Sequence, residues 1–169
     1  MSEEREIIKC IMDIIKGYMN LDNEHCYIYN QKWLIPEDKS LYVCIGCSNI
    51  ETIGNPLKYR RTETDLISVN SVLISESYFL EMYSYSNEAR IRQPEMIACF
   101  NSDLSVRIQE KYQFSFGYVP TRFDDVSRAE ASKILNRYHS EFRVIYGRTY
   151  ERVSPNWNAL GGLKTIIND

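Results

Sequence analysis

Lys111-Tyr-Gln-Phe-Ser-Phe-Gly-Tyr118 alternates aromatic residues with polar or small ones, and Tyr138-His-Ser-Glu-Phe-Arg-Val-Ile-Tyr146 shows a similar alternation after Pro120. Successive side chains of a β-strand point to opposite faces, so each segment presents one apolar and one wet face. Aromatic and β-branched residues suit such a half-buried surface. The loop between the segments contains turn formers such as Asp124-Asp125. The pattern predicts two long antiparallel strands within Lys111–Val153, with one buried face.

The composition is that of an ordinary globular protein with one domain. The chain has 169 residues, of which 44% are hydrophobic and 25% charged. At this size, folding buries most of the apolar surface of the unfolded chain. The formal net charge of −3 argues against a protein whose main role is to grip nucleic acid. The 13 tyrosines suit β-surfaces and contact surfaces, because each apolar ring ends in a hydrogen-bonding hydroxyl.

The cysteines and the N-terminus indicate a reducing compartment. Met1-Ser-Glu-Glu-Arg-Glu6 lacks the apolar core of a signal peptide, and no run approaches a membrane span. We therefore expect a cytoplasmic product with no membrane partner, whose five cysteines are free thiols. Cys44 and Cys47 form a CxxC pair, but no second pair follows at zinc-site spacing. They lie in or beside the apolar run Leu41–Ile45, where Cys packs as a small hydrophobe, so we expect no metal and no cofactor.

The first half of the chain predicts one helix and two strands. Ser2 and the acidic residues after it favour a helix start, and apolar residues then recur at three- and four-residue steps until Gly17–Asn20. Leu41–Ile45 has the composition of a buried strand. Cys47–Asp65 is polar and is either a hairpin arm or a working loop. Leu66–Tyr83 predicts a long strand, in which Glu76 breaks the apolar phase and marks a bulge or a second strand.

The middle of the chain predicts a helical crossover. Asn87–Phe100 is a capped helix that Pro94 either kinks or divides, and Ser102-Asp103 begins a further short helix. Ser127–Glu130 has capping-box spacing, which predicts one or two helical turns through Ile134-Leu135. The fold class is therefore α+β: a twisted, mainly antiparallel β-sheet packed by an N-terminal helix and a crossover helix, with a β-hairpin arm.

The chain closes with a segment of different character. We predict a single domain over residues 1–153 and a C-terminal tail over residues 154–169. Ser154-Pro-Asn-Trp-Asn-Ala-Leu-Gly-Gly162 has no hydrophobic period, and a tail of this kind frays unless something holds it. Pro155 and Trp157 therefore predict docking, either on the same domain or on a neighbouring subunit.

No arrangement of residues predicts catalysis, so we expect a protein that is not an enzyme. His25 and His139 lack a recognisable nucleophile partner, and Gly161-Gly162 lacks the lysine of a phosphate-binding loop. Asp124-Asp125 is a turn. The aromatics of Phe114–Tyr118 could stack single-stranded bases. However, the basic and glycine residues of RNA-recognition modules are out of place here, which favours core packing.

Two segments carry a family resemblance that covers Ile7 to Val153. Tyr78-Phe-Leu-Glu-Met-Tyr-Ser-Tyr85, followed by the Asn87–Phe100 helix, resembles the strand and Ala-bearing helix of tailed-bacteriophage neck and tail terminator proteins. Asp125-Val-Ser127, followed by Asn136-Arg-Tyr138, resembles the segment before the last strand of that family.

The resemblance implies a structural virion protein of the tail or neck, made in the host cytoplasm. Such a protein forms a homo-oligomeric, hexameric ring that ends the tail tube and joins it to the head-side connector. Its partners are therefore the head–tail connector protein and the tail tube protein, and DNA passes through the lumen without specific binding. The resemblance implies no catalytic residues.

An alternative class remains, a non-enzymatic α/β domain that binds a ligand or nucleic acid through the polar arm. Within the structural class, a head-completion adaptor and a tail-tube protein are the nearest competitors. Ring assembly brings one face of a subunit against a different face of the next. The candidate interface residues come from the arm and the tail: Lys58, Tyr59, Arg60, Arg61, Pro155 and Trp157.

Overall fold

The computed structural model describes residues 6–29, 36–62, 65–130 and 133–153. Its elements are, in chain order, α1 (Ile7–Met19), the 3-10 turn η1 (Asn23–His25), β1 (Cys26–Ile28), β2 (Tyr42–Gly54), β3 (Leu57–Arg61), β4 (Leu66–Ser84), α2 (Glu88–Ile91), α3 (Gln93–Cys99), α4 (Asp103–Tyr112), β5 (Phe114–Tyr118), β6 (Asp124–Asp125), β7 (Arg128–Glu130) and β8 (Lys133–Val153). None of these helices has the length and hydropathy needed to cross a bilayer.

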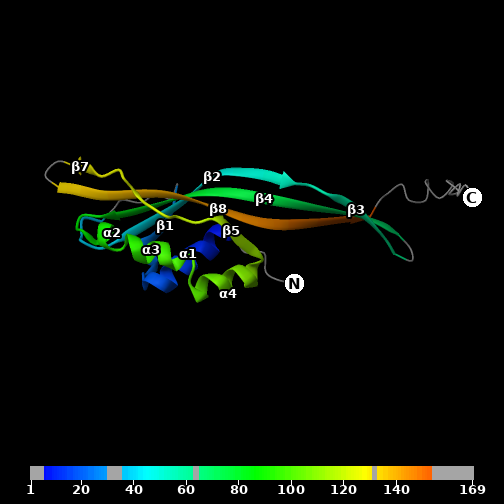
Figure 1. Cartoon of the computed structure of the whole chain (residues 1–169), viewed down its shortest axis with the longest axis horizontal. Coiled ribbons are helices and arrows are strands. Elements are labelled where there is room, and N and C mark those ends of the chain that lie inside the picture. The colour runs from blue at the N-terminus through cyan, green and yellow to red at the C-terminus, as the bar shows by residue number, and fades with distance from the viewer. Residues whose placement is uncertain (1–5, 30–35, 63–64, 131–132, 154–169) are drawn as a thin grey trace, which may run out of the picture. The chain divides into compact units, whose positions relative to one another are not determined.

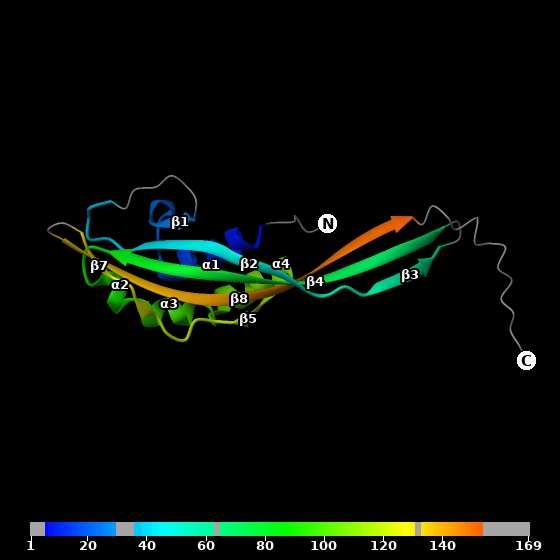
Figure 2. The same cartoon turned by 90° about the horizontal axis from the view of Figure 1, so that it is seen from above.

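The strands form a mixed, mostly antiparallel sheet in the order β1-β2-β4-β8-β5 (Figure 2). β1 runs parallel to β2, and β5 runs antiparallel to β8 with Phe114 opposite Tyr146 and Phe116 opposite Val144. β3 pairs with β4, while β6 and β7 pair with β8. The predicted α+β class and the antiparallel pairing within Lys111–Val153 are both confirmed.

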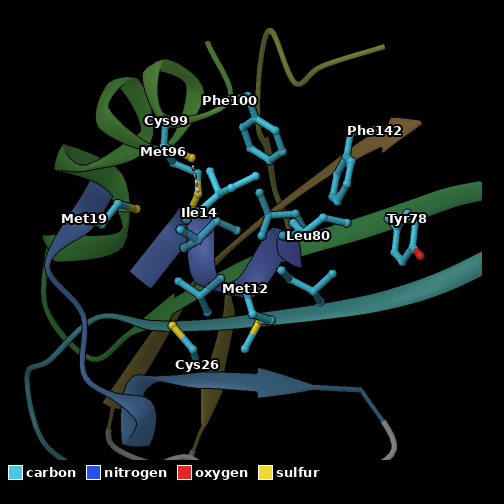
Figure 3. Packing of buried hydrophobic residues seen from close by; sticks show 14 of the residues in the cluster. Met12, Ile14, Met19, Cys26, Tyr78, Leu80, Met96, Cys99, Phe100 and Phe142 are labelled. Carbon is cyan, nitrogen blue, oxygen red and sulfur yellow. Dashed lines mark hydrogen bonds between the residues drawn. The ribbon is translucent and has the colours of Figure 1, made fainter. Parts of the chain in front are cut away.

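The helices α1, α3 and α4 lie on one face of the sheet (Figure 1). Apolar residues at three- and four-residue spacing give α1 one buried stripe, which includes Ile11, Ile14 and Ile15. Figure 3 shows Ile14 near Leu80 of β4, with Met96 of α3 beside them. Each fully buried side chain of this size stabilises the fold by roughly 1.5–3 kcal/mol.

Aromatic rings fill the core between the sheet and α3. Phe142 stacks on Tyr78 with ring centroids 5.3 Å apart and lies 5.1 Å from Phe100. Phe116 meets Phe100 edge-on at 5.1 Å and Phe114 at 5.7 Å. Phe114 is 5% exposed and Phe142 1% exposed. The predicted apolar phase of the two strands is therefore the face that packs against the helices.

The first strand of the Lys111–Val153 pair is shorter than predicted. Lys111 and Tyr112 form the last turn of α4, and Gln113 then adopts a left-handed conformation with φ 57°. The Gln113 N–H donates to the Gln109 carbonyl, which closes the helix. Strand pairing begins only at Phe114, and Tyr112 reaches the core from the helix.

The helix boundaries follow local signals. α1 ends at Met19 with Asn20 left-handed at φ 53°, as predicted for Gly17–Asn20. Pro94 occupies the first turn of α3, which confirms that it begins a second helical half. Ser102 caps α4 by accepting a hydrogen bond from the Ser105 N–H, also as predicted. Ser2 lies outside the described residues, but α1 begins only at Ile7 with Glu6 as its N-cap, so the predicted helix start at Ser2 is wrong.

The helical turns predicted after Ser127 are wrong. Arg128–Glu130 forms β7, which pairs antiparallel with the start of β8, and Ile134-Leu135 belongs to β8. The Ser127 hydroxyl accepts the Arg137 N–H at 3.0 Å, so it binds a strand instead of capping a helix. The long-range pairing with β8 thus overrides the local capping spacing.

β4 continues through Glu76, so no second strand begins there. The Glu76 side chain is only 8% exposed, and its carboxylate accepts hydrogen bonds from the hydroxyls of Tyr78 and Tyr146. A buried carboxylate is tolerated when its oxygens find donors. The two tyrosines supply these donors, which explains how a charged residue fits the apolar phase.

The chain divides into two compact units, and β2, β4 and β8 contribute to both. The first unit comprises Met1–Glu51 and Ser75–Tyr146, and the second comprises Thr52–Ile74 and Gly147–Asp169. The first unit contains the described helices and the core above. The single domain over residues 1–153 remains a prediction.

Gly46 leaves room for an aromatic ring on the sheet face opposite the helices. A Cβ atom at Gly46 would lie 2.3 Å from the Phe79 ring and 2.8 Å from the Tyr29 side chain. The Phe79 ring in turn packs edge-on against Tyr29 at 5.1 Å and stacks with His139 at 6.1 Å. The ring therefore covers a glycine of the neighbouring strand, an arrangement that fixes strand register.

We expect Gly46→Ala to lower the free energy of unfolding by about 1–3 kcal/mol, because the added methyl displaces the Phe79 ring. Gly147→Ala is the matched control, since nothing lies within 4 Å of a Cβ there. Urea unfolding followed by circular dichroism measures both variants. A Gly46→Ala variant as stable as the control would contradict this account of the glycine.

Candidate functional site

The second unit contains an extended β-sheet, which we call the arm and define by its described residues 52–62, 65–74 and 147–153. β3 pairs antiparallel with the first half of β4, and Leu57 lies opposite Asn70. On the other side of β4, the Ser68 hydroxyl donates to the Arg152 carbonyl of β8 at 3.1 Å. The hairpin of β3 and β4 confirms the predicted β-hairpin arm.

The alternation of strand residues gives the arm two different faces. Leu57 lines a shallow hollow of about 370 Å³ together with Ser68, Asn70, Val72, Tyr150 and Arg152, and we call this side the Asn70 face. The register places Tyr59 and Arg61 on the same side. Lys58 and Arg60 point to the opposite side, which we call the Lys58 face.

The four predicted arm residues are thus divided between the two faces. All four are exposed, as expected of contact residues. Arg60 forms an ion pair with Glu151 at 2.9 Å on the Lys58 face. An exposed pair of this kind adds only about 0–1 kcal/mol to stability. Pro155 and Trp157 lie outside the described residues, so their predicted docking remains a prediction.

The arm exposes apolar side chains that a water-soluble sheet normally hides. Leu57 is 54% exposed and Tyr59 62% exposed, and four more large apolar residues of the arm are exposed: Ile53, Leu73, Tyr150 and Val153. No helix covers either face within the described residues of the arm. A group of large apolar side chains exposed on a sheet indicates a contact site.

The arm also differs in charge from the rest of the chain. Its described residues include five basic side chains against the two acidic residues Asp65 and Glu151: Lys58, Arg60, Arg61, Arg148 and Arg152. The whole second unit has six Lys and Arg against four Asp and Glu, and the first unit has 14 against 19. The two units therefore carry net charges of opposite sign.

A second polar cluster lies in the first unit, on the sheet face opposite the helices. Glu81 of β4 is 5% exposed and accepts hydrogen bonds from the Tyr83 hydroxyl and from Arg137 Nη2, the latter at 2.5 Å. His139 Nδ1 lies 3.3 Å from the same carboxylate. The Arg137 guanidinium also stacks over the Tyr83 ring at 5.4 Å.

The environment of Glu81 favours its charged form. Burial alone would raise the pKa of Glu81, but hydrogen bonds from Tyr83, Arg137 and His139, with the charge of Arg137, lower this pKa below its ordinary value. Burial, the hydrogen bond to Glu81 and the charge of Glu81 raise the pKa of Tyr83. The cluster is thus a structural ion pair that joins β4 to β8.

The CxxC cysteines lie on opposite sides of β2. Cys44 is buried and packs with Tyr42, Tyr83 and Leu135, whereas Cys47 is exposed. Burial and the charge of Glu81 raise the pKa of the Cys44 thiol to about 11, so it stays protonated at neutral pH. No group of three or more metal-ligating side chains occurs in the part of the chain that the structure describes.

The aromatics of Phe114–Tyr118 do not form an open stacking platform. Phe114 is buried and Phe116 half-buried against Phe100 and Phe142, and only Tyr118 is exposed. The predicted core packing is confirmed for Phe114 and Phe116 and is wrong for Tyr118, which follows a register shift in the pairing with β8. Base stacking on these two rings would require opening the core.

Another hollow of about 430 Å³ borders the end of α1 and is lined by polar residues that include His25, Lys39 and Arg92. Arg92 is already engaged, because its guanidinium bonds Glu95 at 2.6 Å and the Met19 carbonyl at 2.6 Å. These contacts tie α3 to the end of α1 and give Arg92 a structural role.

Sequence reasoning did not identify Glu81, Arg137 or Asn70 as notable residues. For Glu81 a signal was present, since a carboxylate between Tyr residues on a buried strand needs a cation, and Arg137 lies on the other long strand. No feature of the sequence around Asn70 indicated a role for this residue. No protein-family model matches this chain, and a search of curated proteins finds no significant match.

Glu81→Gln should destabilise the protein at pH 7 by about 1.5–3 kcal/mol, because it removes charge-assisted hydrogen bonds to a buried group. The folded-state pKa of Glu81 is lowered, so its stabilising contribution is present above the unfolded value near 4.5 and is lost as pH falls through the folded value. The difference between wild type and variant should therefore shrink in acid. Urea unfolding at pH 7 and at acidic pH measures it, and Glu141→Gln, an exposed site of β8, is the control.

Proposed function

We propose that this protein is a structural subunit of a bacteriophage neck, which assembles into a hexameric ring that ends the tail tube and joins it to the head-side connector. The observation that supports this proposal most strongly is the arm. It is a sheet with exposed apolar side chains and no covering helix among the described residues, and it carries a basic charge. A surface of this kind suits assembly with another protein.

The edges of the arm favour assembly as well. β3 pairs with β4 on one side only, and no described strand pairs with its outer edge. A free strand edge presents unpaired N–H and C=O groups, which can add a strand from another chain. The Lys58 face offers Leu73 and Val153 as apolar anchors beside the Arg60–Glu151 ion pair.

Charge complementarity favours a second copy of this chain as the partner. The arm is basic and the first unit is acidic, so the arm of one subunit is attracted to the first unit of the next. Such a contact joins two different surfaces and repeats around a closed ring. A net charge of −3 on each subunit suits a lumen through which DNA slides without being held.

A second candidate function is binding of nucleic acid or another anionic ligand by the arm. The five basic side chains on the arm favour it. The ring proposal expects no tight binding of duplex DNA at about 150 mM salt, because the acidic first unit opposes it. Fluorescence anisotropy with labelled duplex and single-stranded DNA separates the two candidates, and tight binding would reject the ring proposal in favour of the second.

We expect light scattering over a concentration series to show self-association of the full chain, and negative-stain microscopy to show rings. Leu73→Lys should weaken this association by about 10- to 100-fold, because a charge replaces an apolar anchor of the Lys58 face. Ile91→Lys is the control for a charge added at an exposed apolar site, since Ile91 is 70% exposed on α2 of the first unit. A chain that stays monomeric at every concentration, or equal loss in both variants, would count against the arm as the joint.

A further inference from the structure

The Asn70 face of the arm contains a hollow, and no described helix covers it. We infer that the C-terminal segment, residues 154–169, folds back onto the Asn70 face of its own arm and places the Trp157 indole in the hollow. This contact does not depend on the neck proposal, which uses the Lys58 face and a second copy.

The Asn70 face lacks a second layer among the described residues. A β-sheet is stable in water when at least one of its faces packs against another element. In the first unit the helices provide that layer, but the arm has none among the described residues. Leu57 and Tyr150, which line the hollow, remain 54% and 48% exposed. A segment that covers them would complete the arm.

The hollow combines apolar walls with a cation and a buried amide oxygen. Leu57, Val72 and Tyr150 provide apolar and aromatic walls, and Arg152 provides a cation that can lie over an aromatic ring. The Asn70 side-chain oxygen is buried and has no hydrogen-bond partner among the described residues. Rotation about the soft terminal torsion of the Asn70 side chain can turn this oxygen toward a donor in the hollow.

Tryptophan matches these requirements. Its ring buries about 150–250 Å² of surface, and its indole N–H is a donor that seeks an acceptor when buried. The hollow of about 370 Å³ has room for one such ring. Trp157 therefore meets the apolar walls, the cation and the unpaired oxygen with one side chain.

The chain between Val153 and Trp157 is long enough for Trp157 to reach the hollow. Trp157 follows Val153, the last residue of β8, by four positions, which span at most about 14 Å when extended. The Arg152 carbonyl already lies beside Ser68, two residues along β4 from Asn70. Ser154-Pro-Asn156 has the composition of a turn, and a turn at this position would return the chain toward the hollow. Because the tail is tethered there, its local concentration at the hollow is high.

The test uses the fluorescence of Trp157 in the full chain, with Trp33→Phe so that Trp157 is the single tryptophan, and with excitation that tyrosine does not absorb. We expect a blue-shifted emission and acrylamide quenching about two- to fivefold weaker than for a peptide of residues 154–169, because docking excludes the quencher. Protection should be unchanged on 100-fold dilution, since the contact is intramolecular. Quenching in the full chain as strong as in the peptide would overturn the inference. Loss of protection on dilution would also overturn it, because the hollow would then bind the tail of a neighbouring copy.

Substitutions on the two faces locate the contact. Leu57→Ser removes a wall of the hollow and should raise the quenching of Trp157 at least about twofold, whereas Leu73→Ser on the opposite face should not. Circular dichroism checks that each variant is folded. If Leu57→Ser does not fold, Asn70→Ala replaces it, because that change removes the acceptor without removing a wall. Equal effects from both faces would show that Trp157 does not occupy the hollow.

Discussion

Burial of one sheet face against helices is the constraint on which the rest of this fold depends. In the first unit, Ile11, Ile14 and Ile15 of α1 and Met96 of α3 close over β2, β4 and β8. The long strands β4 and β8 also enter the second unit, where no described helix accompanies them. The strands that the two units share are thus covered by helices in the first unit, and no described helix covers them in the second. An exposed sheet face is stabilised by a packed layer, and we propose that a partner and the chain's own tail supply it.

The polar residues of β4 show how the covered unit tolerates charge. Glu76 and Glu81 are an odd number of residues apart, so they point to opposite faces of the same strand. Each carboxylate is held by hydroxyls of tyrosines, Tyr78 and Tyr146 for Glu76 and Tyr83 for Glu81, and Arg137 adds a cation to the second. These bonds connect β4 with β8 on both faces. The abundance of tyrosine, which suggested contact surfaces, is therefore partly explained by internal hydrogen bonding.

Most of the fold could be predicted because its strongest signals are local and periodic. The α1 stripe, the long β4 strand and the Ser102 cap each depend on neighbours within a few positions, and all were correct. Two of the errors have different causes, a distant strand partner at Ser127 and a local left-handed conformation at Gln113. Ser127 has capping spacing, but pairing with β8 draws it into a strand connection, and Gln113 ends α4 through a left-handed turn that alternation cannot reveal. The arm was visible as a long polar stretch, but which of its residues share a face requires the register with β4.

The strand register also decides which face of the arm each of the residues Lys58 to Arg61 occupies. The candidate interface residues Lys58 to Arg61 are consecutive, yet β-strand geometry gives two of them to each face. One face then offers Lys58, the Arg60–Glu151 pair and Leu73, and the other offers the hollow beside Asn70. A strand with two unlike faces can serve two contacts at once. The arm is therefore suited to hold its own chain on one side and a neighbour on the other, and this division needs no change in the strands themselves.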